Sequence, residues 1–171
     1  MTETVKSQAN NGLADKLDRL ARAVASPGFS AAGRAALKRY IAGQSVPLEF
    51  YKLWLTKVER DLPSEQDTPV WALLAWGLAI YGAGATSRDC SLGRVLAESR
   101  YSEARLERLL AADEKIRTAL FASTIRFLSR DKSAFDWLDA ARLLFARKSE
   151  ARERIRRKIA ADYYHHSLNT Q

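Results

Sequence analysis

The chain has 171 residues, of which 47% are hydrophobic, and its formal net charge at pH 7 is +8. This length suits one domain or two small halves that share a core, and the apolar content excludes a disordered chain. The most apolar stretch, residues 70–81, is far shorter than the roughly 20 residues of a membrane span. A single cysteine, Cys90, excludes an internal disulfide, and the polar N-terminus lacks a secretory pattern. We therefore expect a cytoplasmic protein with no membrane partner.

Most of the excess charge lies near the C-terminus. Residues 142–158 contain eight basic and two acidic side chains, a local charge of +6, and their spacing is helical. Basic side chains held on an ordered helix suit a long polyanion, because they release counterions from its phosphates. The alternative is a solvated helix surface that only keeps the protein soluble.

The pattern of apolar residues predicts helices throughout. No run of alternating residues predicts a strand, so we expect an all-α protein, a compact bundle of about eight or nine helices. The first helix carries a stripe that begins at Leu13 and ends at Val24. Ser30 is placed to cap a second helix that includes Ile41 and stops near Gly43.

The third helix starts at Ser45 and Pro47. Its predicted inward side consists of Leu48, Tyr51, Leu55 and Val58. After a polar loop, Pro69 opens the most apolar helix, which we expect to be buried on most sides.

The second half of the chain predicts five more helices. Their expected N-terminal caps are Ser91, Ser102, Asp113, Asp136 and Ser149. On the helix after Asp113, the predicted inward face is Ile116, Leu120, Thr124 and Phe127. Among the tyrosines we expect Tyr40, Tyr101 and Tyr164 to be exposed, whereas most other aromatic side chains fall in apolar stripes.

These segments suggest one domain with polar ends. We expect a flexible N-terminus at residues 1–12, a single all-helical domain at residues 13–164 and a C-terminal tail at residues 165–171. The glycine-containing connection at residues 82–90 marks a possible boundary between halves at 13–82 and 91–164.

Catalytic patterns are missing from the sequence. The two histidines, His165 and His166, are adjacent and point to different sides of a helix, so they form a poor metal pair. The glycines at 82 and 84 do not fit a nucleotide-binding loop, and no acidic cluster of the nuclease kind is visible. We therefore expect no enzyme activity, no metal and no cofactor.

Basic residues also recur at helical spacing outside the C-terminal segment. Arg34 and Lys38 share one helix face with Arg39 beside it, and Arg126 and Arg130 form the same four-residue pair. Such rows can follow a phosphate backbone. No zinc finger, RNP motif or helix-turn-helix is visible, so any nucleic-acid binding should be independent of sequence.

Several motifs in a fixed order resemble the CasB family, the small subunit of the type I-E CRISPR surveillance complex Cascade. The main motif is SLGRVLAESRYSEARLERLLAADE at residues 91–114. The others are RAALKRY at residues 34–40, EFYKLW at 49–54, a helix with Arg126, the pair Asp136-Trp137, ARLL at 141–144 and DYY at 162–164. Two features depart from the family pattern: many members carry a tryptophan near residues 158–160, and the loop at 82–90 is particular to this chain.

The resemblance implies a non-catalytic, all-helical subunit. Two copies would lie head to tail along the complex, beside guide RNA and target DNA and in contact with the subunits CasA, CasC, CasD and CasE. Their role would be to stabilise the R-loop. R-loop formation replaces a DNA duplex by an RNA–DNA duplex of similar stability, so modest contacts with the backbone can decide whether the R-loop forms.

The basic positions of the matching motifs are the predicted contacts with the nucleic-acid backbone. They are Lys38, Arg39, Arg94, Arg126 and Arg142, followed by Arg34, Lys52 and Arg130. For Arg94 and Arg142 the alternative is that the side chains pack on apolar neighbours and reach a helix end or an acidic group. The alternative for the whole protein is a helical adaptor whose basic face binds an acidic protein. An enzyme acting on nucleic acid is the third hypothesis.

Overall fold

The computed structural model describes the backbone of residues 2–170 and the side chains of residues 12–170. This part of the chain contains nine α-helices, one π-helical segment and no strand beyond an isolated parallel bridge between Thr86 and Phe135. The predicted all-α fold is therefore confirmed. The elements are α1 (Thr2–Ala25), α2 (Ala31–Lys38), α3 (Leu48–Leu53), η1 (Trp54–Val58), α4 (Thr68–Tyr81), α5 (Leu92–Glu98), α6 (Glu103–Ala111), α7 (Glu114–Leu128), α8 (Trp137–Phe145) and α9 (Ser149–Asn169).

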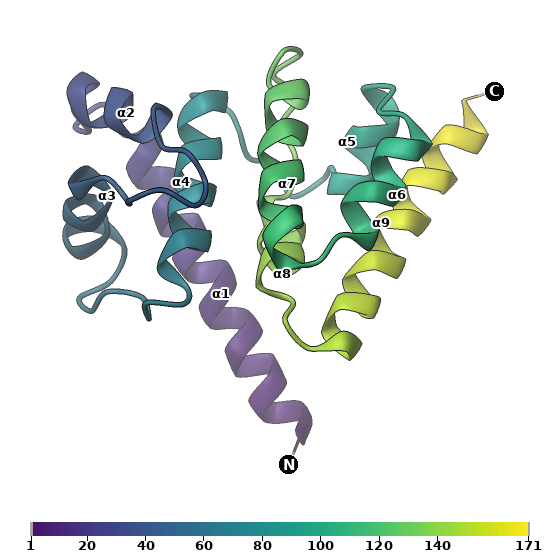
Figure 1. Ribbon diagram of the computed structural model, residues 1–171, viewed down its shortest axis with the longest axis horizontal. Coiled ribbons are helices and arrows are strands. Elements are labelled where there is room, and N and C mark those ends of the chain that lie inside the picture. Colours follow the sequence, from purple (N-terminus) through teal and green to yellow (C-terminus); the bar gives the residue numbers. More distant parts are fainter. Residues whose placement is uncertain (1, 171) are drawn as a thin grey trace.

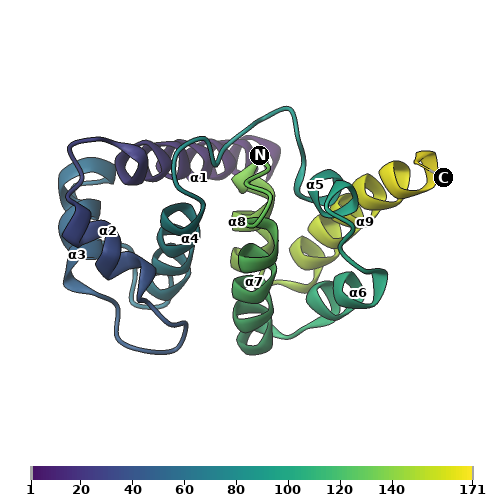
Figure 2. The same ribbon diagram turned by 90° about the horizontal axis from the view of Figure 1, so that it is seen from above.

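The helices form an elongated assembly with a central group between two ends. α2 and α3 lie at one end, α5, α6 and α9 at the other, and α4, α7 and α8 stand between them (Figure 1). Seen from above, α1 runs along one side, whereas α6 lies toward the opposite side beside α7 (Figure 2). Helices from the two halves of the chain therefore meet in the middle of the molecule.

One apolar core continues through both halves. Its buried residues run from Leu17 to Tyr163, and the largest fully buried side chains include Trp54, Trp76 and Trp137. α4 is buried on nearly every side, as its composition predicts. Gly77 of α4 allows the Trp137 ring to approach, because an added Cβ would lie 2.9 Å from that ring.

Several helix starts follow the predicted capping chemistry. Ser30, Ser91, Asp113 and Asp136 each accept a hydrogen bond from a backbone N–H of the first turn, as expected for N-cap residues. Ser102 occupies an N-cap position without a side-chain bond. Ser149 is the first residue of α9 and Lys148 the cap, so that predicted cap is wrong.

The second and third helices differ from their predicted patterns. α2 ends at Lys38 because the chain tightens at Arg39, whose N–H bonds back to Ala35 and Ala36, and this leaves Ile41 outside the helix and exposed. The third helix widens into η1 after α3, which changes the residues that face inward. Its buried residues are Phe50, Leu53, Trp54 and Val58, whereas Leu48 is 82% exposed.

The connection at residues 82–90 is tied to the segment before α8. Phe135 exchanges backbone hydrogen bonds with Ala85 and Ser87, and Asp136 N–H donates to the Cys90 carbonyl at 2.7 Å. The Trp137 indole N–H donates to the Ala85 carbonyl at 3.0 Å. The connection thus attaches to the second half of the chain through several bonds.

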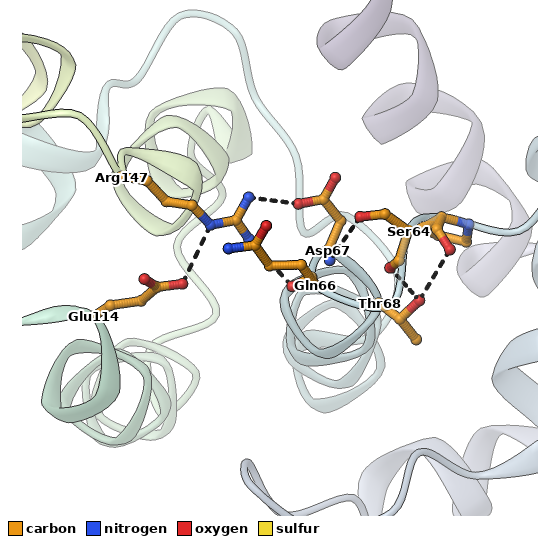
Figure 3. Close-up of polar contacts among 7 residues, drawn as sticks. Ser64, Gln66, Asp67, Thr68, Glu114 and Arg147 are labelled. Carbon is orange, nitrogen blue, oxygen red and sulfur yellow. Dashed lines mark hydrogen bonds and ion pairs between the residues drawn. The ribbon is translucent and has the colours of Figure 1, made fainter.

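Arg147, between α8 and α9, joins three parts of the fold. Its guanidinium donates to Asp67 at 2.7 Å, to Glu114 at 3.3 Å and to the Gln66 carbonyl at 3.1 Å (Figure 3). Asp67 precedes α4 and Glu114 opens α7, so one side chain holds the starts of two central helices together.

The helices extend toward both ends of the chain. α1 begins at Thr2, inside the predicted flexible N-terminus of residues 1–12, and α9 continues to Asn169 through most of the predicted tail of residues 165–171. Met1 and Gln171 lie outside the described residues.

Candidate nucleic-acid interface

A groove between α6 and α7 brings four arginines together. It has a volume of about 580 Å³ and is lined by Tyr101, Arg105, Arg108, Leu120, Ser123, Arg126, Phe127 and Arg130. Arg105 and Arg108 come from α6, whereas Arg126 comes from α7 and Arg130 follows it. All four are exposed, and the lining contains no carboxylate. Two rows of arginines facing one groove concentrate positive charge there, which would favour an anionic ligand.

Aromatic side chains form part of this groove. Arg105 and Arg130 lie over the Phe127 ring, 5.7 and 6.0 Å from its centroid. Tyr101 meets the same ring edge-on at 5.3 Å. Arg126 lies over the Trp76 ring of α4 at 5.1 Å. The aromatic rings therefore hold three of the four guanidinium groups by cation–π contacts, and these groups form no ion pair with a carboxylate of residues 12–170.

Buried hydrogen bonds hold the end of the groove in place. The Tyr101 hydroxyl bonds to Thr124 Oγ1 of α7 at 2.8 Å, and the Tyr163 hydroxyl of α9 donates to the Tyr101 carbonyl at 2.6 Å. The prediction that Tyr40 and Tyr101 are exposed is wrong, because both lie in the core. Tyr164 is half-buried, and its hydroxyl bonds to Glu103 of α6, which raises its pKa to about 12.

The groove occupies the side of α7 that the sequence pattern placed inward. The buried residues of α7 are Arg117, Phe121, Thr124, Ile125 and Leu128. Except for Thr124, each predicted inward residue is replaced in the core by the residue that follows it in the sequence. Leu120 and Phe127 instead line the groove and are half-buried, while Ile116 is exposed. The apolar stripe of α7 is wide because the helix packs against α4, α8 and α6 and also contributes to an open surface.

Arg126 and Arg130 are predicted contact residues that the fold places in this groove. Arg105 and Arg108 are additional candidates that the sequence reasoning missed. Their i, i+3 spacing on a helix whose inward residues are Leu106, Leu109 and Leu110 is the signal that could have found them.

The predicted residues of α2 and α3 lie in another part of the molecule. Lys38 and Arg39 are exposed at the end of α2. Arg34 donates to the Val24 and Ser26 carbonyls at the end of α1 and lies 5.5 Å from the Phe29 ring, so its guanidinium has intramolecular partners. Lys52 lines a separate pocket of about 370 Å³.

Arg94 and Arg142 have different surroundings. Arg94 is exposed on α5 and pairs with Glu98 at 2.8 Å, and this hydrogen bond raises the pKa of Arg94. Glu98 also lies 3.3 Å from His166 of α9. Arg142 is half-buried on α8. Neither residue lines the groove between α6 and α7.

Ion pairs neutralise part of the basic segment at residues 142–158. Arg147 pairs with Asp67 and Glu114, and Arg156 with Glu153. Lys158 binds Asp139, which is 1% exposed, at 2.8 Å and Asp162 at 3.1 Å. Burial opposes the charge of Lys158, but these hydrogen bonds outweigh it and raise its pKa. Part of this segment therefore contributes to folding contacts.

Neither a metal cluster nor a membrane span is found in the described residues. They contain no group of three or more histidine, cysteine, aspartate or glutamate side chains that could hold a metal ion. No helix among them is both long enough and apolar enough to cross a bilayer.

The fold and the groove define an all-helical protein with a cationic groove on its surface. The chain belongs to the family of the CRISPR-associated protein Cse2, whose family model matches residues 33–164. This family is also called CasB, and its members are the small, non-catalytic subunits of type I-E Cascade. The predicted resemblance is therefore confirmed. The comparisons with curated proteins and with solved structures found no match.

Proposed function

We propose that this Cascade subunit binds the backbones of guide RNA and target DNA independently of sequence and stabilises the R-loop during antiviral defence. The observation that carries the proposal is the groove between α6 and α7, with four arginines and no carboxylate in its lining. Guide–target pairing supplies sequence recognition, so the protein needs only contacts that accept any sequence. The same role includes contacts with CasA, CasC, CasD and CasE and with a second copy of this chain.

The proposed contact residues fall into two groups. Arg105, Arg108, Arg126 and Arg130 form the groove, which we place first because the fold gathers them. The remaining sequence-predicted contacts, which we propose as outer contacts along the nucleic acid, are Arg34, Lys38, Arg39, Lys52, Arg94 and Arg142. We further propose that residues 13–164 act as one domain, since a single core passes through both halves.

The salt dependence of DNA binding tests this function. Affinity for a single-stranded oligonucleotide should fall linearly on logarithmic axes as salt rises, because binding releases counterions. Arg108→Gln and Arg126→Gln should each weaken binding and reduce the slope by about 0.7. Fluorescence anisotropy over a salt series, with the full chain starting at low ionic strength, measures both quantities.

Arg154→Gln is the matched control, because Arg154 is an exposed arginine of α9 outside the groove. We expect this variant to keep the wild-type slope. The groove assignment is wrong if Arg108→Gln and Arg126→Gln retain wild-type affinity and slope. The same variants placed in reconstituted Cascade should reduce R-loop yield, and an unchanged yield would contradict the proposed role in the complex.

A further inference from the structure

We infer that the groove between α6 and α7 binds an unpaired base against Phe127, and therefore selects single-stranded nucleic acid over duplex. This inference rests on the proposed function and adds to it the form of nucleic acid that the groove takes. A purely backbone-binding surface needs only cations, whereas this groove also has an aromatic ring in its lining. Aromatic rings bind bases of any sequence because every base has a flat π-face.

The size of the groove suits such a ligand. Its volume of about 580 Å³ lies within the range of about 300–1,000 Å³ that is typical of small-ligand sites. Phe127 is half-buried and packs against Tyr101 with the two ring planes at 65° to each other, so the ring has a fixed position in the wall. A duplex keeps its bases stacked on each other, and only an unpaired base can offer its face to this ring.

A base can displace an arginine side chain from the face of the Phe127 ring. Arg130 lies 6.0 Å and Arg105 5.7 Å from the ring centroid, near the outer limit of a cation–π contact. Base stacking on an aromatic ring is stronger than such an exposed contact. A base that displaces one guanidinium therefore gains stacking, and the displaced arginine becomes available to the adjacent phosphate.

Abasic DNA separates stacking from charge. The probes are an oligo-deoxythymidine strand and an abasic strand of the same length and charge, and binding is measured by competition at low salt. The wild-type chain should bind the base-containing strand about tenfold more tightly. Phe127→Leu should reduce this difference to less than about twofold without changing the salt slope.

Two further variants keep the test independent of folding. Phe127→Tyr retains a stacking ring and should retain the preference for bases. Phe29 is also half-buried and lies under an arginine, Arg34, at 5.5 Å, but it is outside the groove. Phe29→Leu should therefore leave the preference unchanged. Thermal unfolding confirms that each variant is folded.

The outcomes distinguish this inference from the proposed function. Equal wild-type affinity for the abasic and base-containing strands, with a normal salt slope, would overturn base stacking and leave backbone binding intact. Equal affinity for polyglutamate of matched charge would show a general polyanion surface and overturn the inference. Lack of binding to every nucleic acid, even at low salt, would overturn both.

Discussion

Arg117 shows how one side chain can serve folding in a chain rich in exposed arginine. It is 2% exposed, and burial, together with the charge of Arg152, lowers its pKa. Its guanidinium donates to the Leu143 carbonyl at 2.9 Å, to Ala146 at 3.3 Å and to Ala112 at 3.1 Å. These carbonyls lie at the ends of α6 and α8, where helices have unpaired acceptors. Arg117 thus caps two helices from the middle of the core.

Replacing Arg117 should strongly destabilise the fold. Arg117→Ala leaves buried carbonyls without donors, so we expect the free energy of unfolding to fall by about 3 kcal/mol. Arg117→Lys should cost about 2 kcal/mol, because an ammonium group cannot reach both helix ends. Urea denaturation measures both changes. Lys115→Ala, a change at an exposed residue of the same helix, is the control and should have little effect on stability. If the Arg117 variants lost as little stability as this control, the capping role of Arg117 would be refuted.

At the scale of elements, α5 packs closely against α9. Gly93 of α5 faces the backbone of α9, where an added Cβ would lie 2.3 Å from the Ile159 carbonyl and 2.9 Å from the Tyr163 nitrogen. The buried carboxylate of Asp139 also joins this pair to α8, since it accepts from the Leu92 N–H and from Lys158. α9 positions Tyr163, whose hydroxyl supports Tyr101 at the groove.

Gly93→Ala should separate these two helices. The new methyl group meets backbone atoms that cannot rotate away, so we expect a loss of about 2 kcal/mol in the free energy of unfolding. Gly28→Ala is the control, because its Cβ would meet only the Ser26 hydroxyl at an ordinary 3.6 Å. Chemical denaturation compares the two variants, and equal stability would contradict the close packing of α5 on α9.

Element prediction succeeded where chemistry is local. Ser30, Ser91, Asp113 and Asp136 cap helices as predicted, because a cap depends on residues within one turn. The inward faces of α3 and α7 were predicted less well. A π-helical turn changes the helical period after α3, and α7 has neighbours on several sides, so that neither buried face follows from spacing alone.

For the whole molecule, Arg147 links segments that are distant in sequence. Asp67 and Glu114 lie before α4 and at the start of α7, and the three side chains are about one-third to one-half exposed. Such pairs are partly screened by solvent, so their contribution depends on ionic strength.

Arg147→Gln should remove the ion pairs that Arg147 forms with Asp67 and Glu114. We expect the free energy of unfolding to decrease by about 1 kcal/mol at low salt, and by less at high salt because screening already weakens the pairs. Urea denaturation at two salt concentrations measures this difference. Arg156→Gln breaks only the local pair with Glu153 and should change stability by less than about 0.5 kcal/mol. If Arg147→Gln lowered the free energy of unfolding equally at both salt concentrations, an electrostatic contribution of these ion pairs would be refuted.

The sequence by itself determined the all-helical class, the main helix starts and the family, because capping, helical periodicity and motif order are read along the chain. It also supplied Arg126 and Arg130 as candidate contacts. Only the tertiary structure decided which basic residues gather in one place. Arg105 and Arg108 join that pair across the groove, whereas Arg147 and Lys158 hold parts of the fold together. The reason is physical: an arginine has the same charge in the sequence wherever it lies, and its partners in space decide whether that charge serves the fold or a ligand.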